Sequence, residues 1–312
     1  MKKLKIYWNN ICLLRKGEEV FINGYIAKNP DVVFDIEYFG LGMPKKLRAQ
    51  IDADLAESGD VNADVIVSTE LDIFWDKRRL KGGDFFVAAA DGFEACDLIK
   101  NGNFINPERT LAVAQVLPML IAVNESRLKD LKPPETLQDL CSPEYKGKIV
   151  LGGADTAAGR SVAACVEYLY GAEGQKAFLD NAAFAAIPAM AYSLTVRGAF
   201  PVCILPSVLC GRGLKTVCPR DGAPAIPTYV CIHKKADYDA AKGFLDMLFD
   251  KPMQEFYAER GFILPSHKAV APSKVMYGGG VPRLSYPDWG WLNTFGAEAF
   301  SDMMDGIRAS AR

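Results

Sequence analysis

Short apolar runs alternate with amphipathic stretches along the first seventy residues of the chain. The pattern predicts a βαβαβ unit, with strands and helices over residues 3–7, 16–28, 32–39, 44–58 and 63–70. Short apolar strands separated by helices are typical of a mostly parallel sheet with helices on both faces. In such sheets ligands bind beyond the carboxyl ends of the strands. The sequence therefore places candidate ligand-binding residues after the first and third strands: Trp8, Asn9, Asn10, Ser68, Thr69 and Glu70.

Two of these residues have a structural alternative. Trp8 is either a stacking surface for a ligand or a packing residue beneath the first loop. Glu70 either binds an amine or a hydroxyl group, or it is a solvent-facing charge near the start of a helix. Both alternatives stay open at this point.

Two later apolar segments predict how the chain is divided. Residues 110–124 are longer than an ordinary strand, so we expect them to pass from one lobe into a second, and residues 226–233 to return. These segments would be hinge strands. Lobe one would then comprise residues 1–115 plus 234–312, and lobe two residues 116–233.

A turn, a strand and a glycine-flanked helix start follow one another over residues 143–161. The N-terminus of a helix offers backbone N–H groups and the positive end of the helix dipole, which favour an anion. We therefore expect ligand contacts at Asp155, Thr156, Ala157, Gly159, Arg160 and Ser161, and in the following segments at Tyr192, Arg197 and Ser207. The alternative is an ordinary turn capped by Asp155 or Thr156, with Arg197 paired to a surface carboxylate.

Two segments resemble a known family. Residues 137–149 resemble the phrase that enters the second lobe of type II periplasmic-binding proteins, the solute receptors of ABC importers, and especially of their iron, polyamine and thiamine group. Residues 239–265 are similar to the late helix pair of that family. The resemblance implies an α/β, two-lobed fold in which each lobe is a mostly parallel sheet flanked by helices. It also implies two hinge strands and a solute bound in the cleft between the lobes.

The iron-binding members of that family carry paired tyrosines where this chain reads Leu205-Pro206-Ser207-Val208. With only two histidines in the chain, His233 and His267, we expect no metal and no cofactor. The remaining amide, hydroxyl and arginine groups suit a small anion. A cationic amine, bound through Glu70 and an aromatic ring, is the alternative ligand.

Composition narrows the possible partners. A net charge of -2 argues against nucleic acid, and no apolar run is long enough for a membrane span. Eight irregularly spaced cysteines favour reduced thiols over a disulfide framework. The resemblance implies a periplasmic or extracellular location, whereas Met1 as the native start, without a signal peptide, would imply a cytoplasmic one.

The leading hypothesis is therefore a solute-binding receptor that performs no chemistry. We expect it to be a monomer that binds a small polar, anionic solute and delivers it, if exported, to an ABC permease. A cytoplasmic ligand sensor or carrier of the same fold is the alternative. An enzyme is disfavoured because the chain has no Gly-x-Ser-x-Gly elbow, phosphate-binding loop or dinucleotide fingerprint.

Overall fold

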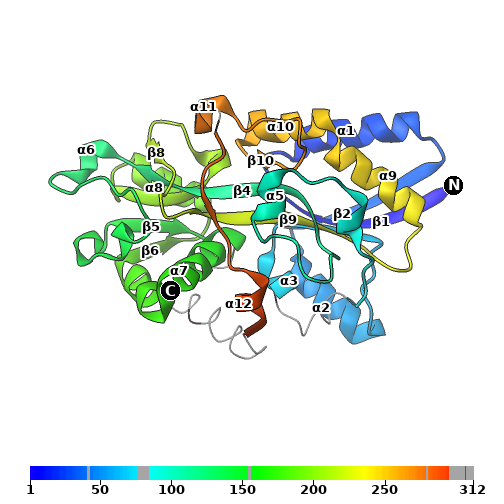
Figure 1. Cartoon of the computed structure of the whole chain (residues 1–312), viewed down its shortest axis with the longest axis horizontal. Coiled ribbons are helices and arrows are strands. Elements are labelled where there is room, and N and C mark those ends of the chain that lie inside the picture. Colours follow the sequence, from blue (N-terminus) through cyan, green and yellow to red (C-terminus); the bar gives the residue numbers. More distant parts are fainter. Residues whose placement is uncertain (41–42, 76–83, 154–155, 279, 295–305, 307–312) are drawn as a thin grey trace. The chain divides into compact units, whose positions relative to one another are not determined.

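In the computed structural model the chain forms two compact units (Figure 1). The structure describes residues 1–40, 43–75, 84–153, 156–278, 280–294 and 306. Unit 1 comprises Met1–Val116 and Pro227–Pro272, and unit 2 comprises Leu117–Ile226 and Ser273–Arg312. Each unit is an α/β structure with its own sheet.

The sheet of unit 1 is built around β1 (Lys2–Asn9), which pairs in parallel with β2 (Val32–Tyr38) and with β3 (Val65–Ser68). On its other side β3 pairs antiparallel with β9 (Ala223–Ile232). The short β10 (Leu264–Pro265) pairs antiparallel with β4 (Ala112–Val123). All residues of β4 and β9 are buried, which explains why their sequences read as continuous apolar runs.

Helices cover both faces of the unit 1 sheet. Figure 1 shows α1 (Arg15–Lys28), α9 (Tyr238–Phe249) and α10 (Lys251–Gly261) on one face and α2 (Leu47–Ser58) on the other. The Asp237 side chain caps α9 by accepting a hydrogen bond from the backbone N–H of Ala240. Shorter helices of this unit are η2 (Ala89–Gly92), α3 (Leu71–Trp75) and α5 (Asp97–Asn101).

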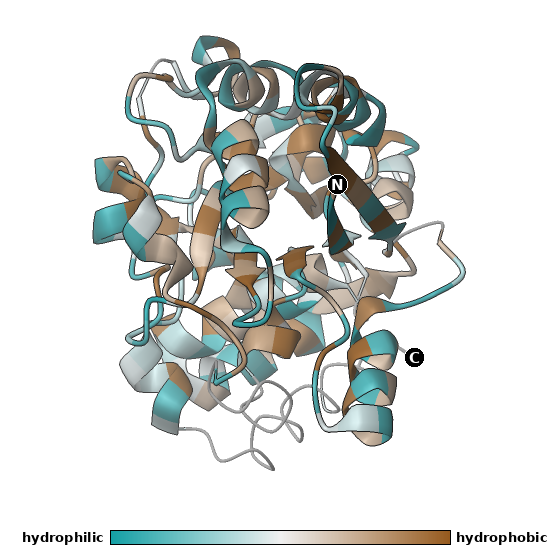
Figure 2. Cartoon of the chain, turned by 90° about the vertical axis from the view of Figure 1, so that its right-hand side faces the viewer, coloured by the Kyte–Doolittle hydropathy of each residue, from teal (hydrophilic) through white to brown (hydrophobic). Residues whose placement is uncertain are grey.

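The sheet of unit 2 has a parallel centre. β5 (Ile149–Gly152) pairs in parallel with both β6 (Ala182–Ala185) and β7 (Val202–Pro206). β4 runs antiparallel to β7 and to β8 (Lys215–Val217), and β11 (Leu284–Ser285) pairs in parallel with β9. Leu120, Val150, Cys203 and Leu205 belong to one buried apolar cluster of this unit. Figure 2 colours the chain by hydropathy and shows helices of mixed colour.

The longest helix of unit 2 is α7 (Ala157–Asn181), which begins directly after the loop that follows β5. It is interrupted at Gly171, whose φ of 69° and ψ of -178° are not helical. The other helices are α6 (Glu125–Leu128), η3 (Asp139–Cys141), η4 (Pro143–Tyr145), α8 (Pro188–Val196), η5 (Ser207–Leu209), α11 (Lys274–Tyr277) and α12 (Trp289–Thr294).

The predicted βαβαβ unit is confirmed, since all five elements are present in the predicted order. Two of them are shorter than expected. The helix predicted over residues 44–58 begins at Leu47, and the strand predicted over residues 63–70 spans only Val65–Ser68. The parallel pairing of the three strands follows from the helical connections between them.

The division of the chain differs from the predicted one after Pro272. Residues 234–312 were all assigned to lobe one, whereas the structure groups Ser273 onward with unit 2. The reason is local, because β11 pairs with the first residues of β9 and Asp288 accepts a hydrogen bond from Tyr168 of α7. The apolar pattern of this segment does not specify what it packs against.

The chain crosses from one unit to the other within β4, after Val116, and within β9, after Ile226. Lobe two was predicted to continue to residue 233, so the crossing lies earlier along the second strand than expected. A hinge role for these two strands remains a prediction.

No helix in the described part of the chain has the length and apolar character that a membrane crossing needs. All eight cysteines are free thiols. Cys165, Cys203, Cys210 and Cys231 are buried, and Cys12 is exposed.

Candidate functional site

The carboxyl ends of β1 and β3 bring the predicted residues of unit 1 together. Because the two strands are parallel and in register, Asn9 lies beside Ser68, and the Thr69 N–H donates to the Asn9 carbonyl at 3.0 Å. The Ser68 hydroxyl accepts a hydrogen bond from the Glu70 N–H at 2.9 Å. The predicted loops therefore meet at one edge of the sheet.

Trp8 is a packing residue in this arrangement. Its side chain is only 2% exposed, and its ring lies against Phe244 and Tyr38, with centroid separations of 5.6 and 6.4 Å. The ring faces are therefore not offered to a ligand. Its Nε1 is buried and has no hydrogen-bond partner among the described residues.

A buried polar network continues from this edge into unit 1. Asn10 Nδ2 and the Tyr257 hydroxyl both donate to Glu18 Oε1. Asn10 Oδ1 accepts from Gln115 Nε2 at 3.2 Å and from the Thr228 hydroxyl at 3.3 Å. These two acceptor contacts fix the orientation of the Asn10 amide.

Glu18 was not among the predicted site residues. It lies in the first turn of α1 and is 1% exposed. Burial raises the pKa of its carboxyl group to about 8, although the hydrogen bonds from Tyr257 and Asn10 act in the opposite direction. Its second oxygen, Oε2, is buried without a hydrogen-bond partner among the described residues.

The carboxyl edge of the unit 2 sheet holds the second group of predicted residues. β5, β6 and β7 are parallel, so the start of α7 and Ser207 follow strands that end at the same edge. Arg160, in the first turn of α7, is 6% exposed. A guanidinium group and a helix N-terminus thus occupy this edge together.

The side chain of Thr156 does not cap the N-terminus of α7. The Thr156 hydroxyl donates to the Gly153 carbonyl at 2.8 Å and makes no capping hydrogen bond. Gly159 and Ser161 are buried within the helix, and the Ser161 hydroxyl donates to the Ala158 carbonyl at 3.1 Å. Ala157 is half-buried at the helix start. Asp155 lies outside the described residues.

Tyr192 and Arg197 have different surroundings from Arg160 and Ser207. The Tyr192 hydroxyl donates to the Arg212 carbonyl at 2.8 Å, and its ring packs on the core of unit 2. Arg197 follows the end of α8 and precedes β7, so it belongs to the amino edge of the parallel strands. It is exposed and forms no ion pair among the described residues.

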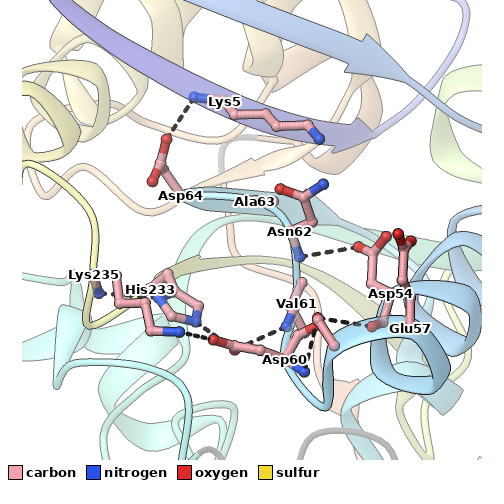
Figure 3. Close-up of a pocket in the computed structure, with 11 residues that line it drawn as sticks. Lys5, Asp54, Glu57, Asp60, Val61, Asn62, Ala63, Asp64, His233 and Lys235 are labelled. Carbon is pink, nitrogen blue, oxygen red and sulfur yellow. Dashed lines mark hydrogen bonds and ion pairs between the residues drawn. The ribbon is translucent and has the colours of Figure 1, made fainter.

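Figure 3 shows a different pocket, at the amino edge of the unit 1 sheet, with a volume of about 430 Å³. Asp60 lies 2.8 Å from His233 Nε2 and also pairs with Lys235. The hydrogen bonds from Lys235 and His233 lower the pKa of Asp60 to about 2. Asp54 accepts from the Tyr7 hydroxyl and Asp64 from the Lys5 N–H, so these acids already have protein donors.

In the described ranges, no group of three or more His, Cys, Asp or Glu side chains is arranged to hold a metal ion. Ser207 follows β7, where the resemblance to the iron-binding proteins would place paired tyrosines. It hydrogen-bonds to Tyr277, whose pKa is raised by burial.

The chain forms two α/β units, and two strands pass from one unit into the other. Polar side chains gather where the parallel strands end. These features are typical of binding proteins of the two-lobed α/β class. Residues 60–286 match the family described as bacterial extracellular solute-binding protein, and the chain belongs to this family. No curated protein matches the sequence.

Solved structures show the same fold over almost the whole chain. The apo ferric ion-binding protein A of Pasteurella haemolytica has 17% identity and a TM-score of 0.74, and the match covers 99% of this chain and 98% of that one. The ferric binding protein of Campylobacter jejuni has 14% identity and a TM-score of 0.77, with 97% and 99% coverage. The protein AfuA of Actinobacillus pleuropneumoniae, solved with fructose-6-phosphate bound, has 19% identity, a TM-score of 0.69 and coverage of 99% and 98%.

The predicted type II periplasmic-binding-protein fold is therefore confirmed. The family consists of solute-binding proteins of ABC importers, which bind small ligands and perform no chemistry on them. At identities below 20%, the structural matches establish the fold and leave the solute of this chain open.

Proposed function

We propose that this chain is the receptor of an ABC importer for a small anionic solute, which it binds and releases unchanged. The observation that carries the proposal is the buried Arg160 in the first turn of α7. A guanidinium group is planar and permanently charged, and its parallel N–H donors match the oxygens of a carboxylate or phosphate group. Its position at a helix N-terminus adds a second feature that favours negative charge.

The two features reinforce each other chemically. The first turn of α7 contains no acidic residue, so the helix dipole and the Arg160 charge have the same sign there. A carboxylate or phosphate group accepts two parallel hydrogen bonds from a guanidinium group and also neutralises its charge, whereas an ammonium group repels it and a neutral solute leaves its charge unpaired. An anion is therefore the solute class that this edge of unit 2 favours.

The proposal also assigns solute contacts to the carboxyl edge of unit 1. Asn10, Thr69 and Glu70 follow its parallel strands, where ligands of α/β proteins bind. These residues offer amide, hydroxyl and backbone groups suited to the hydroxyl groups of a phosphorylated or carboxylated metabolite. We propose a monomer that delivers this solute to an ABC permease.

A thermal-shift screen tests the proposed function. The panel would contain phosphorylated and carboxylated metabolites, with amines and neutral polyols of similar size as the comparison. At a concentration one hundred times Kd, a bound solute stabilises the protein by about 2.7 kcal/mol, which gives a rise of several degrees in Tm. Stabilisation by amines alone would refute an anion receptor, and conversion of the stabilising compound to a product would refute a purely binding function.

A further inference from the structure

The side chain of Asn10 belongs to a hydrogen-bond network within unit 1, directly after the end of β1. Its oxygen, Oδ1, accepts from Gln115 Nε2 at 3.2 Å and from the Thr228 hydroxyl at 3.3 Å. Its nitrogen, Nδ2, donates to Glu18 Oε1 at 2.5 Å. An amide oxygen has two lone pairs, and an amide nitrogen has two N–H groups. The network therefore occupies both lone pairs of the Asn10 side chain and leaves it one N–H group.

Gln115 and Thr228 hold the Asn10 amide in this orientation. Both residues are fully buried, Gln115 on β4 and Thr228 on β9. Gln115 Nε2 also donates to the Thr228 hydroxyl at 3.2 Å, so the proton of that hydroxyl is directed at Asn10. The reverse orientation would place the Asn10 oxygen against Glu18 Oε1, which already accepts from the Tyr257 hydroxyl at 3.0 Å. The amide oxygen therefore faces the two strands, and the amide nitrogen faces α1.

The remaining N–H group of Asn10 belongs to the edge of the sheet where the parallel strands of unit 1 end. Asn10 is half-buried and follows β1, whose carboxyl end lies beside that of β3. Ligands of α/β proteins bind at this edge. No acceptor for the second N–H group is present among the described residues. This group can therefore donate to a solute atom that has a lone pair, and an ammonium group has none.

Arg15 adds a positive charge near Asn10. Both residues line one cavity of about 30 Å³ at the start of α1. The Arg15 guanidinium group stacks on the Tyr38 ring at 3.7 Å, which fixes its plane. Its Nε donates to Glu19 at 3.0 Å and its Nη1 to Met43 Sδ at 3.2 Å. A guanidinium group has five N–H donors, so these contacts leave some of them for a solute. The charge of Arg15 favours an anionic acceptor over a cation.

We propose that the Asn10 side chain is a donor-only contact for an oxygen atom of the anionic solute, and that Gln115 and Thr228 are the residues that position it. The inference rests on the proposed function and assigns part of its specificity to unit 1. A carboxylate or phosphate oxygen accepts from the remaining Asn10 N–H group, whereas a protonated amine meets only a donor. Glu18 does not alter this preference, because it is 1% exposed and out of reach of a solute.

The two Nδ2 protons of Asn10 report directly on this contact in NMR spectra. The full chain would be isotopically labelled at asparagine, and the Asn10 pair assigned as the signals missing from Asn10→Ala. Inorganic phosphate, formate and methylammonium are the probes. We expect phosphate and formate to shift one proton of the pair in a saturable way, and the proton bonded to Glu18 to move less. Methylammonium should shift neither proton. Asn62, at the amino edge of the sheet, is the internal control and should not respond to any probe.

Two results would overturn the inference. One is that neither phosphate nor formate changes the Asn10 protons, and the other is that methylammonium shifts them as strongly as the anions do. The thermal-shift screen separates this inference from the proposed function. An acidic metabolite that stabilises the chain without moving the Asn10 signals would refute the Asn10 contact and leave the anion receptor standing. Stabilisation by amines alone would refute both.

Matched variants at Thr228 test the positioning role. Thr228→Val keeps the shape of the side chain but removes the hydroxyl donor to Asn10 Oδ1, so we expect roughly tenfold weaker binding of phosphate. Thr228→Ser keeps the hydroxyl and should bind phosphate as the wild type does. The preference for phosphate over methylammonium should also fall in Thr228→Val, which a general loss of stability would not cause. Equal phosphate binding by the two variants would remove the positioning role of Thr228.

Discussion

Two carboxyl groups of unit 1 lie at opposite edges of the same sheet and in opposite electrostatic surroundings. Asp60, at the amino edge, pairs with Lys235 and lies 2.8 Å from His233, and its pKa is lowered to about 2. Glu18, at the carboxyl edge, is nearly fully buried without an ion pair among the described residues, and its pKa is raised to about 8. The first group stabilises its charged form and the second its neutral form.

The two carboxyl groups therefore contribute differently to the stability of the fold. The ion pairs and hydrogen bonds of Asp60 stabilise the fold, so the larger pocket around it needs no ligand to explain its residues. Glu18 instead costs stability at neutral pH, and one of its oxygens has no partner among the described residues. Glu18 is therefore the more strongly destabilised of the two ionised carboxyl groups, although Asn10 and Tyr257 both donate to it.

The two arginines of the predicted site in unit 2 differ in a similar way. Arg160 is 6% exposed in the first turn of α7, whereas Arg197 is exposed after the last residue of α8. Both were expected to contact the ligand. The structure places only Arg160 at the edge where the parallel strands end.

The largest effect is expected for Glu18→Gln on the pH dependence of stability. The pKa of Glu18 in the folded protein, about 8, exceeds the ordinary value of 4.5, so its stabilising contribution is present below pH 4.5 and is lost as the pH rises to 8. At about 1.4 kcal/mol per pKa unit, the variant should gain on the order of 5 kcal/mol over the wild type across this range. Urea unfolding at pH 5 and pH 8.5 measures the gain, with Glu19→Gln as control. A constant difference between the two proteins would contradict the assignment.

The variants Arg160→Lys and Arg197→Lys test whether the two arginines differ in their contribution to solute binding. The ammonium group keeps the charge but loses the two parallel hydrogen bonds, so we expect about 10- to 100-fold weaker binding of the anionic solute. Arg197→Lys should bind as the wild type does. Isothermal titration calorimetry with the compound identified by the thermal-shift screen gives both constants. Equal losses in the two variants would remove the distinction between the two edges of unit 2.

Asp60→Asn should reduce stability at neutral pH by about 1–2 kcal/mol, because Asp60 is about one-fifth exposed and solvent screens part of its interaction. The pKa is depressed in the folded protein, so this stabilisation is present above pH 4 and is lost as the pH falls to about 2. Chemical denaturation at pH 7 and pH 2.5 measures the difference. Glu57→Gln, on the wall of the same pocket, is the control.

Tyr257→Phe should have the smallest effect on stability, a loss of about 1 kcal/mol for one buried hydrogen bond. The Tyr257 hydroxyl lowers the pKa of Glu18, so its removal should raise that pKa further. NMR titration of the Glu18 carboxyl carbon in the variant measures the shift. A downward shift would show that the hydroxyl does not stabilise the ionised form.

Local pattern was sufficient to predict the βαβαβ unit and the meeting of the loops after β1 and β3. Alternating apolar positions predict the strands, and helical crossovers predict their parallel direction, so the loops after β1 and β3 are expected at the same edge of the sheet. The pairing of β1 with β3, which makes Asn9 and Ser68 neighbours, comes from the structure. The position of Arg160 at the start of α7 follows from the glycine-flanked turn in the same way.

Glu18 could not be predicted from the sequence because its surroundings are assembled from distant segments. Glu18 and Glu19 are adjacent acids on one helix, and only the packing of α10 shows which one is buried. Its partner Tyr257 is 239 residues away in the sequence. The grouping of the segment after Pro272 with unit 2 also depends on distant residues, since β11 pairs with β9.

Native mass spectrometry of protein purified under gentle conditions tests the central claim most directly. We predict one phosphorylated or carboxylated metabolite bound per chain, released with its mass unchanged, and absent from a parallel preparation of Arg160→Ala. A co-purified amine or metal ion retained by both preparations would contradict the account.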